Sequence, residues 1–259
     1  MTLQYARLFQ LRAGLELIAE RNQTTRDELA DALRQRKNID YPDKDATEGA
    51  DDIITHLQNA YLIRETTDGY QLTTHDEVDD AVDNTILLHA GDEILGAGNE
   101  RVQADRVLAN IMYEHPMLVL LSKHVYRYGP VTSNEMKRKF DGEAFLKDKM
   151  NAFTIDMGLD LLTDADVIEQ GQNGYTKGRW PVRLFTHIVY EEYTDLGGTA
   201  DGGIREPQLF ERLETLYGID HNTFDRLLSR LQTEGIVSEA SYEELIFNPK
   251  TIHGANIHE

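Results

Sequence analysis

Cysteine is absent from the 259-residue chain, which excludes disulfide bonds, a thiolate nucleophile and any metal site built on thiolates. No apolar run approaches the ~18 residues that a membrane-spanning helix requires, and the first residues lack the apolar core of a secretory signal. Lysine is also scarce, with nine lysines against 17 arginines. We therefore expect a cytoplasmic protein that makes no membrane contact.

Acidic side chains dominate the charge, because 46 aspartates and glutamates face 26 lysines and arginines and leave a formal net charge of −20. Such a charge normally opposes nucleic-acid binding, which depends on neutralising phosphates. High acidity with few lysines and no cysteine resembles the halophilic cytoplasmic proteins of haloarchaea that accumulate salt. At about 1 M salt the Debye length is only about 3 Å, so net charge then says little about the partner. An ordinary acidic protein stays open as the alternative.

A sequence pattern recurs three times, at residues 52–73, 157–178 and 226–247. Each copy has an apolar residue, a leucine three positions later and an apolar pair that begins five positions after that leucine. The first spacing is helical, and the apolar pair begins a strand. In the first two copies the dipeptides Asp68-Gly69 and Asn173-Gly174 predict two-residue type I′ turns. The pattern therefore predicts a helix followed by a β-hairpin.

The residues before each copy predict further helices. Thr25 with Glu28, and Thr132 with Glu135, have the spacing of capping boxes, in which the hydroxyl and the carboxylate each accept a backbone N–H. These boxes open helices over 26–37 and 133–140. The other helices that the apolar spacing predicts cover residues 8–21, 117–128, 182–193, 207–217 and 221–234, and the last helix of the second copy is expected to begin at residue 147.

This order of three helices and a hairpin resembles the winged helix-turn-helix superfamily, closely over 8–73 and 117–178 and more loosely over 205–248. The resemblance implies a mainly α fold with small β-hairpins (α+β), made of two to three tandem winged-helix units and a helical connector. The expected boundaries are 1–74 for the first unit, 75–114 for the connector, 115–181 for the basic second unit and 182–259 for the third. The connector either packs the units together or forms a homodimer contact, and the sequence does not choose.

The second unit carries an excess of positive charge, with seven cations against four anions between residues 123 and 149. Winged helices that read DNA place cationic donors at the start of the third helix and on the hairpin, or wing. The resemblance therefore implies binding of double-stranded DNA here, with Asn151 able to pair with adenine. The candidate DNA-binding residues are Lys137, Arg138, Lys139, Lys147, Lys149, Asn151, Lys177 and Arg179.

The predicted function is a non-enzymatic DNA-binding protein, either a transcription regulator or a maintenance factor of a mobile element. The chain lacks the sequence motifs of common catalytic sites, and we expect no catalytic residue, metal or cofactor. A protein-interaction adaptor is the rival, because acidic tandem winged helices resemble accessory subunits of chromosome-organising and other multiprotein complexes. The acidic third helix of the first unit favours this rival through Asp45, Glu48, Asp51 and Asp52.

Overall fold

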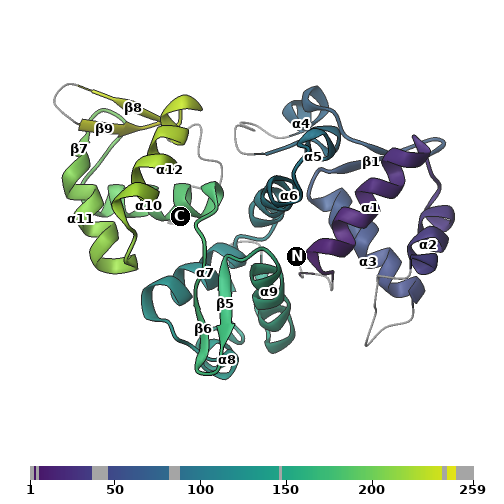
Figure 1. Ribbon diagram of the computed structural model, residues 1–259, viewed down its shortest axis with the longest axis horizontal. Helices are drawn as coiled ribbons and strands as arrows, with labels where there is room; N and C mark the ends of the chain where they lie inside the picture. The colour runs from purple at the N-terminus through teal and green to yellow at the C-terminus, as the bar shows by residue number, and fades with distance from the viewer. Residues whose placement is uncertain are drawn as a thin grey trace.

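Helices and short antiparallel hairpins alternate along the chain, as the sequence predicts. The computed structural model of the protein describes residues 3, 6–36, 46–81, 88–145, 148–240 and 244–248. Figure 1 shows three groups of helices, each with a hairpin, around the central helix α6. The described helices include none that is both long enough and apolar enough to cross a membrane.

The first group opens the chain. Its elements are α1 (Leu8–Arg21), α2 (Arg26–Gln35), α3 (Ala46–Asn59), β1 (Ile63–Thr66) and β2 (Gly69–Leu72). The predicted capping box is present, because Glu28 N donates to Thr25 Oγ1 at 3.3 Å and Thr25 N donates to Glu28 Oε2 at 3.0 Å. Helix α2 ends at Gln35, and the predicted end at Lys37 lies outside the described residues, as does Asp45.

Three helices connect the first group to the second: α4 (His75–Ala81), α5 (Gly91–Gly96) and α6 (Glu100–Glu114). Helix α6 packs against α1, α7 and α10, and it buries Val107, Leu108 and Ile111. Val102, in the first turn of the same helix, is 41% exposed. The connector therefore packs the groups together, while a homodimer contact stays a prediction.

The second group differs from expectation at the start of its third helix. Its elements are α7 (Met117–Tyr128), α8 (Ser133–Phe140), β3 (Ala144–Phe145), β4 (Asp148–Lys149), α9 (Ala152–Asp164), β5 (Ile168–Gly171) and β6 (Gly174–Lys177). The prediction that the helix begins at residue 147 is wrong, because α9 begins at Ala152. Backbone hydrogen bonds from Gly142 N to Met150 O and from Met150 N to Glu143 O, both 3.0 Å, close a β-ribbon before it.

The third group completes the described chain. Its elements are α10 (Val182–Asp195), β7 (Ile204–Arg205), α11 (Glu206–Tyr217), α12 (His221–Thr233), β8 (Val237–Glu239) and β9 (Glu244–Phe247). The strands form one antiparallel sheet in the order β7-β9-β8. In the first two groups a single residue, the one before the capping threonine, pairs with the second strand of the hairpin as β7 pairs with β9. These bridges are Thr24–Tyr70 and Val131–Tyr175.

The three sequence copies share one local geometry where the last helix of each group meets its hairpin. The residue two positions after the end of the helix is left-handed in each copy, with φ of 58° at Tyr61, 56° at Asp166 and 71° at Gly235. The next backbone N–H donates back to the helix at 2.9 Å in each copy: Leu62 to Leu57, Val167 to Leu162 and Ile236 to Leu231. The repeat in the sequence therefore corresponds to a repeat in the backbone.

The turns of the first two hairpins are not of the predicted type. Thr66 pairs with Gly69, so the central turn residues are Thr67 and Asp68, and neither has the positive φ that a type I′ turn needs. The second hairpin follows the same pattern, with Gly174 on the strand at φ 118°. Glycine is needed on the strand because a Cβ at Gly174 would lie 2.5 Å from the carbonyl oxygen of Val131. Glycine is therefore required by the close approach of the neighbouring backbone and not by the conformation of the turn.

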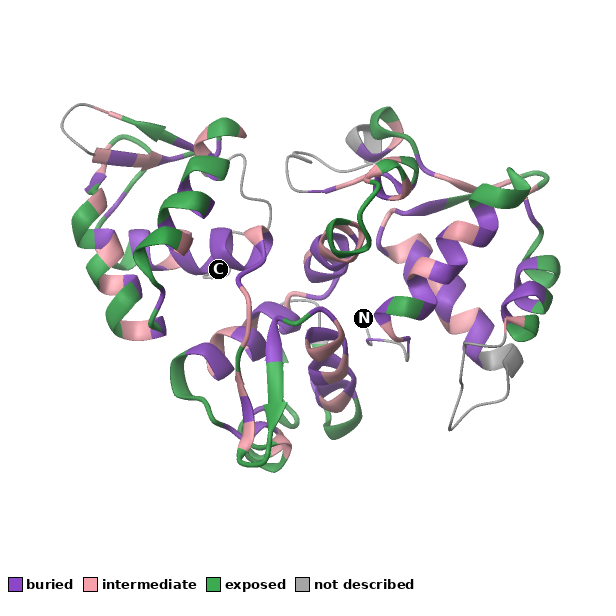
Figure 2. Cartoon of the chain, in the orientation of Figure 1, coloured by how far each residue is buried: buried purple, intermediate pink, exposed green. Residues whose placement is uncertain are grey.

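One hydrophobic cluster extends from Leu3 to Phe247 and includes side chains of all three groups and of α6. In Figure 2 the buried residues lie on the sides of the helices that face one another. Trp180 is 9% exposed and packs where the second and third groups meet, with its ring centre 4.5 Å from that of Tyr126 and 6.3 Å from that of Tyr217. The apolar core is therefore continuous from one group to the next.

Candidate functional site

The candidate DNA-binding residues come from four places in the second group: α8, the ribbon β3–β4, the start of α9 and the end of β6. Lys137 on α8 lies against α9, where its Nζ is 2.5 Å from Asp156 Oδ2. The second oxygen of Asp156 accepts a hydrogen bond of 2.7 Å from Ser133 Oγ. Lys137 is therefore engaged in holding α8 to α9.

The outer face of α9 is acidic. Asp156, Asp160 and Asp164 follow one another at intervals of four residues, which places them on one side of the helix. Arg7, before α1, donates from Nε to Asp164 Oδ2 at 2.6 Å, and its Nη1 is 4.0 Å from Asp160 Oδ2. Burial raises the pKa of Asp160. The helix expected to enter the major groove thus presents carboxylates, and its final turn is bound to the first group.

Asn151 caps α9. Its Oδ1 accepts hydrogen bonds from the backbone N–H of Phe153 and of Thr154, both at 3.0 Å. The oxygen that a bidentate contact to adenine requires is already used in the fold. Lys147 lies outside the described residues, and Lys149 is exposed on β4.

The hairpin residues Lys177 and Arg179 contact the rest of the protein. Lys177 Nζ donates to the carbonyl oxygens of Tyr217 at 3.1 Å and Gly218 at 2.7 Å, where α11 ends. A cation there satisfies carbonyl groups that the helix leaves open and lies at the negative end of its dipole. Arg179 forms an ion pair with Asp105 of α6. These two side chains join the hairpin to the third group and to the connector.

Lys177 is exposed despite its hydrogen bonds to the end of α11, and three other candidate cations are exposed: Arg138, Lys139 and Lys149. No carboxylate pairs with them among the described residues. Two large aromatic side chains accompany them, Tyr128 and Phe153, each 54% exposed, and Lys139 Nζ lies 5.5 Å from the centre of the Tyr128 ring. We refer to these five residues as the cation–aromatic set. It combines positive charge with apolar area, and it lies on α7, α8, β4 and α9.

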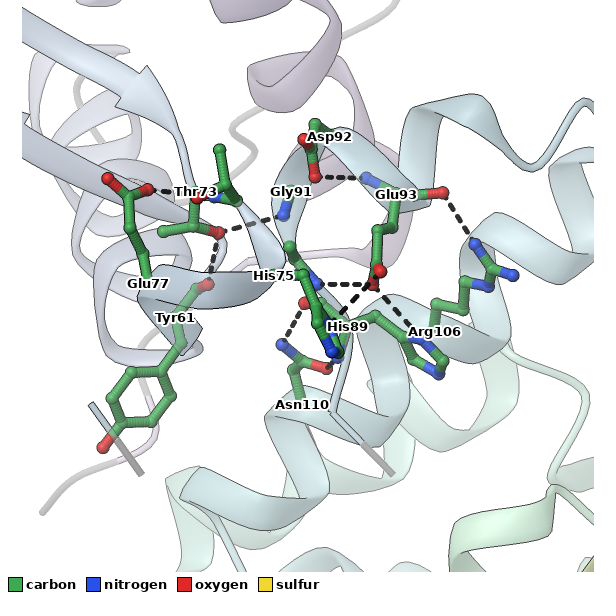
Figure 3. A network of polar contacts seen from close by, with 12 residues as sticks. Tyr61, Thr73, His75, Glu77, His89, Gly91, Asp92, Glu93, Arg106 and Asn110 are labelled. Carbon is green, nitrogen blue, oxygen red and sulfur yellow. Dashed lines mark hydrogen bonds and ion pairs between the residues drawn. The ribbon is translucent and has the colours of Figure 1, made fainter. Parts of the chain in front are cut away.

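A polar network holds the connector to the first group (Figure 3). Asn110 of α6 donates from Nδ2 to the carbonyl oxygens of Ala60 and His89, both at 2.8 Å, and its Oδ1 accepts from His89 N at 3.0 Å. Thr73 Oγ1 donates to the Tyr61 carbonyl oxygen at 2.7 Å. The network fixes the backbone around His89.

His89 has an unusually low pKa. Burial lowers the pKa of His89 to about 4, and the charges of Arg106, Arg230 and His75 lower it further. The carboxylate of Glu93 would raise the pKa of His89, because its Oε2 lies 4.0 Å from His89 Nδ1. This oxygen also accepts a hydrogen bond from Ala90 N at 3.1 Å. Burial is the dominant effect, so the imidazole is neutral in the folded protein at neutral pH.

Acidification should therefore destabilise the protein through His89. The unfolded state binds this proton more tightly than the folded state, so stability falls as the pH falls below the ordinary histidine pKa. We expect a loss of about 2 kcal/mol between about pH 7 and pH 5 from this residue, in addition to the carboxylate contribution. Urea unfolding of the wild type and of His89→Gln at both pH values measures it. Equal losses in the two proteins would contradict the assignment.

Sequence reasoning overlooked the partners of the candidate cations. The four-residue spacing of Asp156, Asp160 and Asp164 was visible as a helical pattern and could have indicated an acidic face. Asp105, in contrast, lies on α6, and helices α7, α8 and α9 come between it and Arg179, so the pair carries no local signal. No family model, curated protein or solved structure matches this chain.

Proposed function

We propose that the protein is a cytoplasmic, non-enzymatic adaptor that binds another protein through its second winged-helix module. The module assignment is supported by the helix and hairpin order of the three groups and by their shared backbone geometry at Tyr61, Asp166 and Gly235. Winged helices serve as DNA readers and as protein-binding modules, so the surface has to decide between these functions.

The acidic face of α9 is the observation that carries this proposal. Duplex DNA binding needs cations at the third helix, where phosphates would otherwise meet carboxylates. Here Asp156, Asp160 and Asp164 occupy that face, where Asp156 is paired with Lys137 and Asp164 with Arg7. Lys137, Lys177 and Arg179 each contact another part of the protein, although Lys177 stays exposed. Little of the surface that a DNA reader requires is left.

The cation–aromatic set suits a protein partner. Aromatic residues and arginine are enriched in protein interfaces, and a few of them typically supply most of the binding energy. Phe153 and Tyr128 offer apolar area that needs a complementary hollow, and Arg138, Lys139 and Lys149 favour carboxylates on the partner. The expected partner is a protein with an acidic segment around an apolar depression.

Site-specific crosslinking tests the adaptor function. A photo-crosslinking amino acid in place of Phe153 should yield one discrete protein adduct in the cells that produce the protein, and the same group in place of exposed Glu211 on α11 should not. Reversing the charges in Arg138→Glu/Lys139→Glu/Lys149→Glu should abolish that adduct. The matched control reverses three exposed arginines elsewhere, Arg21, Arg101 and Arg226, and should leave it unchanged.

DNA binding through the same three cations is the second candidate function, as a transcription regulator or a mobile-element factor. It is favoured by one observation: Arg138, Lys139 and Lys149 are exposed and lack carboxylate partners among the described residues. Fluorescence anisotropy of labelled duplex DNA over a KCl series, with the same charge-reversal variants, separates the two functions. Salt-dependent affinity that the Arg138/Lys139/Lys149 variant loses, without a protein adduct at Phe153, would replace the adaptor proposal.

A further inference from the structure

A pocket of about 140 Å³ lies between α6, the start of α10 and the end of α12. It lies away from the cation–aromatic set, and the proposed adaptor function does not use it. Its ionisable lining residues come from separate parts of the chain: His89, Asp105, Arg106, Arg183, Arg230 and Glu234. Three arginines around one small pocket contrast with a formal net charge of −20 for the chain.

Arg106 gives this pocket an excess of positive charge. Its Nη1 donates to the backbone carbonyl oxygen of Glu93 at 2.6 Å, as Figure 3 shows. No described carboxylate forms an ion pair with Arg106, whereas Asp105 pairs with Arg179 and Arg230 pairs with Glu234. The N-terminal end of α10, which also lines the pocket, adds partial positive charge of the same sign. The pocket therefore attracts an anion.

Glu234 adds a requirement for a hydrogen-bond donor. Its Oε1 accepts from Arg230 Nε at 2.5 Å, while its Oε2 is buried and has no hydrogen-bond partner in the part of the chain that the structure describes. A buried acceptor without a donor costs free energy, so a ligand that supplies an O–H or N–H gains from this position. The pocket thus combines cations for a negative group with an acceptor for a proton on the same group.

We propose that the pocket binds hydrogen phosphate, with the arginines facing its charged oxygens and Glu234 Oε2 accepting its hydroxyl proton. Hydrogen phosphate keeps this proton throughout the neutral range. Sulfate has no such proton, and above about pH 6 most molecules of a phosphate monoester have lost the proton from their phosphate group. The pocket volume is well below the roughly 300 Å³ at which sites for larger organic ligands begin, so it suits a small oxyanion.

Hydrogen phosphate in this position would connect the connector to the third group. Arg106 belongs to α6, whereas Arg230 and Glu234 lie at the end of α12. A ligand that contacts both sides stabilises the arrangement in which they face each other. Phosphate would then strengthen the packing of the third group against the rest of the chain.

Equilibrium dialysis of the full chain against radiolabelled inorganic phosphate, in KCl buffer at neutral pH, tests the proposal. We expect one phosphate per chain, displaced at least about tenfold less effectively by sulfate or methyl phosphate than by unlabelled phosphate, because neither carries the proton that Glu234 accepts. Arg106→Gln should lower phosphate affinity by about tenfold or more. Arg226→Gln, an exposed position on α12 outside the pocket lining, is the matched control and should leave the affinity unchanged.

Glu234→Gln separates this proposal from general anion binding. The glutamine amide can donate where the carboxylate accepts, so sulfate should then bind about as well as phosphate. This comparison stays informative if the Arg106 variant fails to fold. The proposal is overturned if the wild type shows no saturable phosphate binding. It is also overturned if sulfate and methyl phosphate compete for the site as well as unlabelled phosphate does in the wild type. Neither result bears on the crosslinking at Phe153, so the two proposals fail separately.

Discussion

Replacing Gly174 with alanine should lower the free energy of unfolding by about 3 kcal/mol or more. The residue has φ 118°, a conformation that L-amino acids with a side chain rarely adopt. The new Cβ would lie 2.5 Å from Val131 O and 3.0 Å from Thr132 N. Those backbone atoms are held by the hydrogen bond from Tyr175 N to Val131 O at 2.7 Å, so the clash has no easy relief.

Gly171, at the other end of the same turn, provides the matched control. Its φ is not positive, and an added Cβ would come no closer than 3.7 Å, to Gly174 O. Gly171→Ala should therefore change the stability by less than about 1 kcal/mol. Urea unfolding followed by far-ultraviolet circular dichroism compares the two variants. Similar losses in both would mean that the close approach to Val131 does not determine the glycine at 174.

Replacing Trp180 with alanine should cost about 3–5 kcal/mol, the usual range for removing a large aromatic side chain from a core. Trp180 is 9% exposed, and its ring makes edge contacts with Tyr126 of α7, Phe185 of α10 and Tyr217 of α11. The lost side chain would leave a cavity where the second and third groups meet. Because these rings come from three helices, little local relaxation can fill it.

Trp180→Phe is the companion variant. A phenyl ring keeps part of the contact with Tyr126 and Phe185, so we expect about half the loss that alanine causes. Circular dichroism suits the measurement, because Trp180 is the sole tryptophan and its removal eliminates the usual fluorescence signal. A loss below about 1 kcal/mol for Trp180→Ala would contradict the packing of this side chain between the two groups.

Local signals in the sequence predicted the helices well. The capping box at Thr132 predicts a helix that begins at Ser133, and α8 begins there. The apolar spacing predicts α1 and α7 with the bounds that the structure has. The ribbon β3–β4 was not predicted, because two-residue strands produce no periodic pattern, and the extended Asn151 before α9 depends on its own capping hydrogen bonds. Signals that span one or two helical turns were therefore sufficient for helices and insufficient for short β-ribbons.

The candidate site was less predictable than the fold. A count of cations along the sequence indicates positive charge in the second group, but it does not say whether each cation faces solvent. Lys177 binds carbonyl groups 40 and 41 residues further along the chain, and Arg179 finds a carboxylate on α6. In a chain so rich in carboxylates, a lysine or arginine often meets a partner inside the fold. Exposure depends on tertiary packing, which composition does not encode.

The continuous apolar core has a consequence for how the chain can be divided. Removing the third group would expose the faces of Trp180 and α7 that now lie against it, and removing the first group would leave Asp164 without Arg7. Shortened versions of the protein would present apolar surface to water and tend to associate with one another. Although the chain consists of three copies of one helix and hairpin pattern, the smallest piece that folds cooperatively should contain all three.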